Sequence, residues 1–223
     1  MELQPIADTL AAWPAAFATP DDADRVPPAW APIAEAADPA ERVRVALARW
    51  NDGFLDFVPK FAAALRTRCA DVRVAFTGAE PVLVYVLEGP DGGPVSWVGH
   101  HPTAFEQPPF WDECFPAPVQ DFLREVHAGF ASQAPTSYGI APPALMATLA
   151  DLAGLPEGIP DWDEDADIAS TRLLRVCGDS GSLDYCLSPD LPVGEVALVY
   201  QGDIDPQDFG AALDELMTRR LEP

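Results

Sequence analysis

A short glycine-rich segment, residues 178–182, comes closest to a catalytic motif, with the sequence Gly-Asp-Ser-Gly-Ser. A serine in such a loop acts as a nucleophile when a histidine base, oriented by a buried carboxylate, lies beside it near an oxyanion hole. No Ala-Ala-His-Cys stretch surrounds any of the three histidines, and Ser182 replaces the second glycine of the loop. We therefore interpret the segment as a tight turn, and an enzyme that uses Ser180 or His127 is the least favoured alternative.

The histidines are the next candidates, because imidazole titrates near neutral pH and can act as a base or a metal ligand. His100 and His101 are adjacent, and adjacent side chains on an extended backbone point to opposite faces. His127 stands beside the apolar face of an expected helix, which favours a hydrogen-bonded structural role. The histidine pattern therefore indicates no metal site.

An acidic run at residues 161–167, Asp-Trp-Asp-Glu-Asp-Ala-Asp, has the alternating carboxylates of a calcium-binding loop. An EF-hand loop needs glycine at its sixth position and glutamate at its twelfth, where this chain has Ala166 and Arg172. We therefore expect no bound metal. Two interpretations stay open: a solvated loop with Trp162 as a core anchor, or a surface that contacts a basic partner through its acids and Trp162.

The charge balance favours a basic partner. The 223 residues include 36 acidic and 13 basic ones, which gives a formal net charge of −23 at pH 7. Nucleic acids and anionic membranes require many cations, so neither is an expected partner, whereas a field of this sign accelerates capture of a basic protein. The predicted contact residues are Asp161, Trp162, Asp163, Glu164, Asp165 and Asp167, followed by Asp203 and Asp205.

Signals for a cofactor or a special compartment are few. The sequence has no glycine-rich phosphate loop, and its four cysteines lack the paired spacing of a zinc site, so we expect no cofactor and free thiols. No apolar stretch approaches the roughly 20 residues that cross a bilayer. Residues 1–5 carry an acid where a secretory signal carries a base, so we expect a cytoplasmic protein.

The elements of the first half are helices followed by strands. Residues 1–36 are rich in Ala and Pro and predict a loosely structured arm whose aromatic side chains dock on the body. Asp38 followed by proline predicts a helix start, and the apolar spacing up to residue 65 predicts a continuation or a second helix around Pro59. Alternating apolar residues over 72–98 predict a small antiparallel meander.

The second half repeats helices, strands and a helix. Apolar spacing predicts helices over 119–130 and 145–152, and Asp205-Pro206 is expected to cap a last helix. The order of elements predicts an α+β fold rather than alternating βαβ units. Five prolines at 100–118 predict a boundary between residues 1–109 and 110–223. The expected strands are 173–177, 183–187 and 196–200.

The second half also resembles the SMI1/KNR4 (SUKH) superfamily over about residues 110–221. Members open with a Phe-Pro or Leu-Pro step and a helix, which Phe115-Pro116 and the residues up to 130 resemble. They close with a strand, a Gly/Asp-rich turn, a Tyr-Cys-Leu-like strand, another strand and a helix, as at 173–187 and 195–216. The resemblance implies a mixed or antiparallel sheet packed with helices, to which residues 1–109 add a helix-and-meander extension.

What the resemblance implies for function is a non-enzymatic binding protein, in bacteria most often an immunity protein that neutralises a secreted toxin. The family has no shared catalytic set. The acidic charge agrees with a toxin whose active-site cleft is basic, because such an inhibitor would be steered to it and could occlude it. The runner-up hypothesis is a regulatory scaffold of the same superfamily without a dedicated toxin. The oligomeric state stays open.

Overall fold

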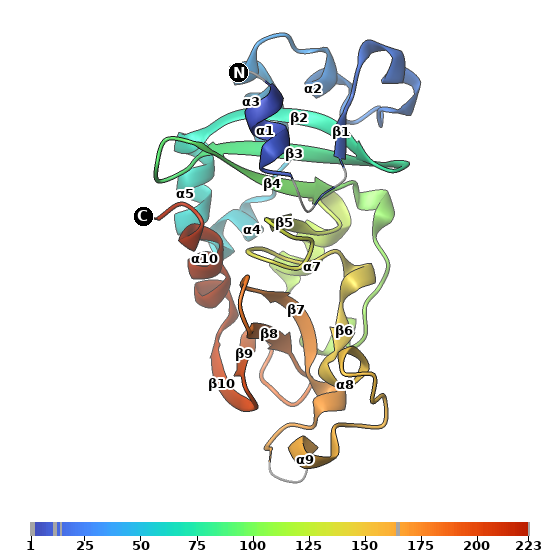
Figure 1. Cartoon of the computed structure of the whole chain (residues 1–223), viewed down its shortest axis with the longest axis vertical. Coiled ribbons are helices and arrows are strands. Elements are labelled where there is room, and N and C mark those ends of the chain that lie inside the picture. The colour runs from blue at the N-terminus through green and yellow to red at the C-terminus, as the bar shows by residue number, and fades with distance from the viewer. Residues whose placement is uncertain (1–2, 11–12, 14, 164–165, 223) are drawn as a thin grey trace.

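The computed structural model describes residues 3–10, 13, 15–163 and 166–222, with the backbone alone at 3–5, 161 and 163. The molecule is elongated and contains two five-stranded antiparallel sheets, one toward each end of the long axis (Figure 1). The predicted α+β class is confirmed.

The first sheet contains the predicted meander. Its strand order is β1-β2-β3-β4-β5, with bounds Ala15–Phe17, Cys69–Thr77, Glu80–Glu88, Pro94–His100 and Phe130–Ser132. The middle three strands confirm the meander expected at 72–98, and one edge strand comes from the N-terminal arm. The other edge strand, β5, lies beyond the boundary predicted near residue 110, so the first sheet takes strands from both predicted parts of the chain.

Short helices precede this sheet in the sequence: α1 (Leu3–Asp8), η1 (Pro20–Arg25), α2 (Ala31–Glu35), α3 (Pro39–Leu47), α4 (Asp52–Phe57) and α5 (Pro59–Arg68). The Asp38 carboxylate accepts from the Ala40 N–H at 3.2 Å, which confirms the expected cap. Of the two alternatives at Pro59, the second helix is confirmed: Pro59 begins α5, and the Asn51 side chain caps a separate short helix, α4, before it.

The N-terminal arm is ordered rather than loose. Trp13 and Trp30 are buried, which confirms the predicted docking of its aromatic residues. The expectation of a loose arm is wrong for its described residues, because they form α1, β1, η1 and α2. Helix α1 covers the outer face of the first sheet, where Ile6 and Leu10 pack on apolar strand residues such as Val84 (Figure 1).

The connection after β4 contains η2 (Pro102–Ala104), α6 (Trp111–Cys114), α7 (Ala117–Asp121) and a π-helical turn, η3 (Phe122–Val126). The helix predicted over 119–130 therefore ends four residues early. Gly129 has a φ of 105°, and the Phe130 N–H donates to the Ile140 carbonyl at 2.7 Å as part of strand pairing. A buried strand residue fits the apolar spacing as well as a helical one, which is why the pattern misled.

Residues 137–141 join the two sheets edge to edge. On one side Phe130 of β5 pairs with Ile140. On the other side the Tyr138 N–H donates to the Gly178 carbonyl and the Ala141 N–H to the Val176 carbonyl, each at 2.9 Å. Both of those carbonyls belong to the second sheet, so this segment links the sheets by backbone hydrogen bonds.

The second sheet has the order β10-β9-β8-β7-β6. The bounds, from β6 to β10, are Ala147–Thr148, Leu174–Gly178, Leu183–Leu187, Glu195–Tyr200 and Asp203–Asp208. The three predicted strands are confirmed as β7, β8 and β9. The remaining elements are η4 (Pro143–Leu145), α8 (Leu149–Leu152), α9 (Pro160–Asp163), η5 (Ser170–Arg172) and α10 (Phe209–Arg219).

Two predicted helix starts in this half are wrong. The pattern over 145–152 becomes helical only at Leu149, because Thr148 caps the helix and residues 147–148 pair with β7. The expected cap at residues 205–206 lies within β10, and the cap of α10 is Asp208, whose carboxylate accepts from the Ala211 N–H at 2.8 Å. Proline suits an edge strand as well as a first helical turn, so Asp205-Pro206 is compatible with either structure.

A shared core holds the two ends together. Aromatic side chains of the first half and apolar residues of β7, β8, β9 and α10 form one cluster. The Asp214 carboxylate of α10 accepts from the N–H groups of Lys60 and Phe61 at 3.0 and 2.8 Å, so it caps α5. Within the described part of the chain, no helix combines the length and apolar character that a membrane span requires.

Candidate protein-binding surface

Residues 126–218, which form most of the second sheet and its surroundings, are strongly unbalanced in charge. They contain sixteen acidic residues and two basic ones, Arg172 and Arg175. Arg172 forms a bidentate pair with Asp190, and Arg175 lies 3.6 Å from Asp184. Both cations are therefore engaged locally. Arg219 and Arg220, which follow this range, lie beside Glu215 and the Tyr138 ring, and the carboxylates still define an excess of negative charge around the second sheet.

The partly buried ion pair, Arg175 with Asp184, and the exposed one, Arg172 with Asp190, differ in their electrostatics. Burial raises the pKa of Asp184 although the Arg175 guanidinium opposes the shift. The hydrogen bond from Arg172 lowers the pKa of the exposed Asp190. The charge that a partner meets at neutral pH therefore comes chiefly from exposed acids outside these pairs.

Trp162 anchors the acidic loop on the second sheet. Its indole N–H donates to the Ile168 carbonyl at 3.1 Å, and its half-buried ring packs with Leu191 and Ile204 on a cluster that includes Val199. Trp162 therefore packs on the second sheet as a core anchor does, while part of its ring stays exposed. The ring also faces the β9–β10 turn: its Cζ3 would lie 3.9 Å from a Cβ added to Gly202.

The predicted acidic residues divide between two faces. The backbone of 160–163 and the β9–β10 turn come together through Trp162. Ile204 points to the Trp162 side, and side chains alternate along a strand, so the exposed Asp203 and Asp205 belong to the opposite face of β10. The sequence grouped them as one site, but they flank the strand from its two sides.

The remaining predicted contact residues are described in part. Asp167 is exposed beside Ile168, and the backbone of Asp161 and Asp163 lies in α9. Glu164 and Asp165 lie outside the described residues. The described acids that can be assigned to the surface are therefore Asp167, Asp203 and Asp205.

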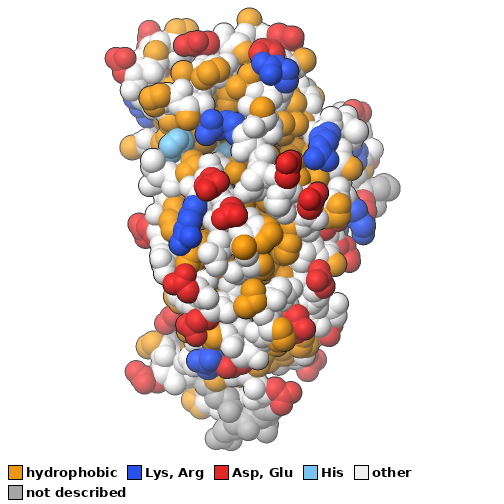
Figure 2. All heavy atoms as spheres, turned by 180° about the vertical axis from the view of Figure 1, so that it is seen from behind, with side chains coloured by type: hydrophobic (Ala, Val, Ile, Leu, Met, Phe, Trp, Pro, Cys, Tyr) orange, Lys and Arg blue, Asp and Glu red, His pale blue; other side chains and the backbone are white. Residues whose placement is uncertain are grey.

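Exposed apolar side chains accompany these acids, and sequence reasoning missed them. Val193 is 61% and Tyr200 48% exposed, and Leu152 and Leu155 are exposed as well. Tyr200 pairs with Asp203 across the β9–β10 hairpin. In the rear view, acidic side chains are scattered over the surface with exposed apolar ones between them (Figure 2). One of these exposed residues could have been found from the sequence, because Val193 is an apolar residue between the turn-forming Pro192 and Gly194.

Strand β10 is an edge strand with a partly blocked outer edge. Its hairpin has a two-residue loop, Gln201-Gly202, with φ values of 51° and 97°. In such a hairpin the flanking residues form the hydrogen-bonded pair, so Ile204 and Pro206 turn their backbone groups to the outer edge. Proline has no N–H, so this edge offers a partner few backbone donors, and recognition there falls to side chains.

The two candidate catalytic residues occupy separate hydrogen-bonded positions. The Ser180 hydroxyl lies 2.8 Å from the Tyr138 hydroxyl in an exposed turn. His127 is buried, its Nδ1 lies 3.2 Å from the His100 carbonyl, and its Nε2 lies 2.8 Å from the Tyr85 hydroxyl. A carbonyl only accepts, so Nδ1 carries the proton and Nε2 accepts from tyrosine. Burial lowers the pKa of His127 to about 3.

The four cysteines are free thiols, and three of them are buried: Cys114, Cys177 and Cys186. Among the described residues, no group of three or more His, Cys, Asp or Glu side chains is placed to hold a metal ion. The surface around the β9–β10 hairpin combines acidic side chains with exposed apolar ones, a combination that suits protein binding. No family model, curated protein or solved structure matches this chain.

Proposed function

We propose that this chain is an immunity protein that binds a cognate secreted bacterial toxin and neutralises it in the cytoplasm. The proposed fold family is SMI1/KNR4, on the resemblance over about residues 110–221. The proposed partner is a toxin domain with a basic active-site cleft, and the proposed contact surface is the acidic end of the second sheet.

The observation that carries the proposal is the charge imbalance of residues 126–218. This range contains sixteen acidic residues and two arginines. Arg172 is paired with Asp190, and Arg175 is paired with Asp184. Such an excess raises the association rate with a basic partner by long-range attraction, and the effect decreases as salt screens the field.

The exposed apolar side chains supply the short-range part of binding. Charge at the rim of an interface mainly steers, whereas buried aromatic and aliphatic groups contribute most of the affinity. Tyr200 and Val193 lie on or next to the strand that carries Asp203 and Asp205. A basic cleft rim would therefore meet acids, and its apolar parts would cover these side chains.

The first test is a pull-down of the tagged chain with the product of the adjacent gene, combined with growth of cells that express that product. A stoichiometric complex and restored growth support immunity. If the neighbouring product is harmless or does not bind, the immunity proposal fails and the regulatory scaffold becomes the better account.

A charge-matched pair of variants locates the surface. The triple variant Asp167→Lys, Asp203→Lys, Asp205→Lys should weaken binding at least about tenfold and flatten its salt dependence. The control triple variant Asp56→Lys, Glu88→Lys, Asp91→Lys changes the net charge equally at exposed sites of the first half and should bind nearly as the wild type. Equal losses in both variants would mean that only the net charge matters.

A further inference from the structure

A pocket of about 430 Å³ opens at the edge of β2, next to the end of β1. Its walls come from β1, η1, α2, α3 and β2, all in the N-terminal part of the chain. The Ala18 N–H donates to the Val74 carbonyl at 3.0 Å, which fixes the chain that leaves β1 against the strand edge. The volume lies within the range of small-molecule sites.

One side of the pocket is cationic. Arg42 Nε and Arg73 Nε donate to the two oxygens of the buried Asp71 carboxylate at 2.7 and 2.8 Å. Burial alone would raise the pKa of Asp71, but the hydrogen bonds from Arg42 and Arg73 outweigh it and lower the pKa. Two guanidinium groups therefore share one carboxylate, which leaves one positive charge uncompensated within this triad.

Arg42 also has an unused donor. Its residue is 7% exposed, and its Nη1 donates to the carbonyls of Ala36 and Ala37 at 2.8 and 2.9 Å. Among the residues that the structure describes, none accepts a hydrogen bond from its buried Nη2. A buried donor without an acceptor costs free energy, so the positive charge of Arg42 beside the pocket is incompletely compensated.

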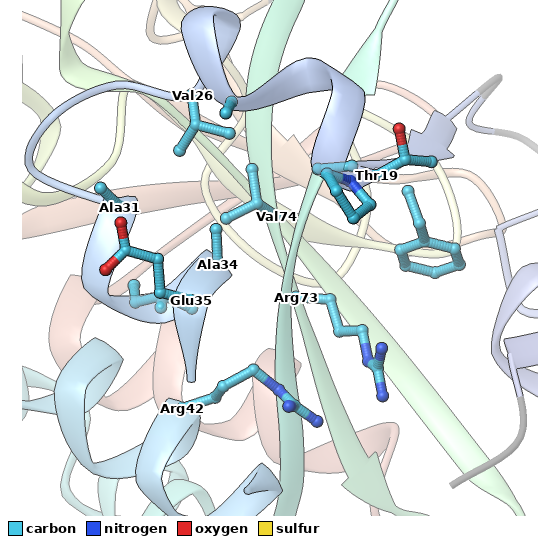
Figure 3. Close-up of a pocket in the computed structure, with 13 residues that line it drawn as sticks. Thr19, Val26, Ala31, Ala34, Glu35, Arg42, Arg73 and Val74 are labelled. Atoms are coloured by element: carbon cyan, nitrogen blue, oxygen red, sulfur yellow. The ribbon is translucent and has the colours of Figure 1, made fainter. Parts of the chain in front are cut away.

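The opposite side of the pocket is apolar. Figure 3 shows Arg42 and Arg73 together on one side, with Val26 and Ala31 across from them. Glu35 also lines the pocket, and its carboxylate points toward Ala31, away from the two guanidinium groups (Figure 3). An occupant would thus meet positive charge at one end and, at the other, hydrocarbon with the Glu35 carboxylate beside it.

We propose that this pocket binds a small organic monocarboxylate with an apolar tail. The carboxylate accepts from the Nη groups of the partly exposed Arg73, next to the positive charge of Arg42, and the tail lies over the apolar wall. Arginine suits this role because its planar fork matches a carboxylate. A monoanion matches the single uncompensated charge of the triad, and the overall charge of −23 disfavours ions of higher negative charge.

The test is calorimetric titration of the full chain with octanoate and, separately, with octanol and inorganic phosphate. Octanoate should bind, octanol should bind at least about tenfold more weakly because it lacks the charge-assisted hydrogen bonds, and phosphate should not compete. No octanoate binding, equal binding of octanol, or competition by phosphate would each overturn the proposal.

Four single variants, each checked for folding by circular dichroism, make the test specific. Arg73→Gln should weaken octanoate binding about tenfold, and Glu35→Gln should strengthen it about twofold by removing a nearby negative charge. Arg66→Gln, an exposed arginine of α5, removes the same charge elsewhere and should leave binding unchanged. Ala34→Leu should block the tail without altering charge. An equal loss in the Arg73 and Arg66 variants would refute a local site.

Discussion

The two sheets have the same number of strands and the same antiparallel pairing, but they are covered differently. The first sheet is buried on both faces: α1 covers one, and the large aromatic cluster that includes Trp97 and Phe122 covers the other. The second sheet shares that cluster on one face and has a smaller cluster around Val199 on the other. Its edge strand β10 is largely exposed.

Charge follows the same division. Residues 1–125 contain nineteen acids and nine basic residues, whereas residues 126–223 contain seventeen and four. The larger buried clusters of the first sheet contribute more to stability, whereas the exposed acids and apolar side chains of the second sheet are available for binding. We infer that stability resides mainly at one end of the molecule and recognition at the other.

The largest expected effect is the loss of a ring from the aromatic cluster. Phe122 is fully buried and stacks on Phe54 with ring centroids 3.9 Å apart. Phe122→Ala should lower the free energy of unfolding by about 3–5 kcal/mol, measured by urea denaturation at pH 7. A loss below about 1 kcal/mol would show that the aromatic cluster does not dominate stability.

A second prediction concerns the loss of folding stability at acidic pH. All three histidines lie beside the first sheet, so their protonation affects that end of the molecule. The folded pKa of His127 is about 3, below its ordinary value of 6.5, so the unfolded chain binds a proton first as pH falls. Its contribution to stability is complete above pH 6.5 and is lost progressively toward pH 3. Between pH 7 and 5 this amounts to about 2 kcal/mol.

His127→Gln removes the titrating group and keeps a hydrogen-bonding side chain. The wild type should therefore lose about 2 kcal/mol more than this variant between pH 7 and pH 5 in urea denaturation. The difference between the two chains cancels the titration of the many carboxylates. His101→Gln, at a more exposed ring, serves as the control and should retain most of the wild-type acid sensitivity. Parallel pH profiles for wild type and His127→Gln would contradict the assignment.

A smaller effect is expected at the second sheet. Trp162 is half-buried in the minor cluster, so Trp162→Ala should cost about 1–2 kcal/mol, less than Phe122→Ala. Amide hydrogen exchange should accelerate mainly in the acidic loop and the β9–β10 hairpin. A loss as large as that of Phe122→Ala would remove the distinction between the two ends.

The smallest effect on stability is expected at the edge of β10. Pro206→Ala should change the free energy of unfolding by less than about 0.5 kcal/mol, yet it adds an outward N–H to the edge. Sedimentation equilibrium at high protein concentration should detect more self-association than in Gln207→Ala, whose N–H points to β9. Identical association in the two variants would mean that Pro206 does not protect the edge.

The sequence predicted strands well where alternation and turns agreed, as in the meander and in β7, β8 and β9. It failed where one pattern suits two structures: Phe130 fits a helix face and a strand equally, and Pro206 fits both a helix start and an edge strand. The sheet-joining segment 137–141 could not be predicted, because its hydrogen bonds connect residues distant in sequence.

The site was predicted less completely. The acidic segments were found from charge alone, but the division of Asp203 and Asp205 from the Trp162 face required the register of β10. The carboxylate pocket was missed, although Asp71 and Arg73 alternate with apolar residues on a buried strand, a pattern that signals a paired charge. Arg42 could not be added from sequence, since it comes from a separate helix.

The partly blocked edge of β10 also bears on how binding specificity can evolve. A partner that added a strand to an open edge would be held by backbone groups, which every sequence shares. At an edge interrupted by Pro206, side chains such as Tyr200, Asp203 and Asp205 would determine the selectivity for a partner. All three are exposed. Substitutions at exposed positions usually change stability little, so under the proposed function the contact surface can change with its partner one substitution at a time while the core of the first sheet stays constant.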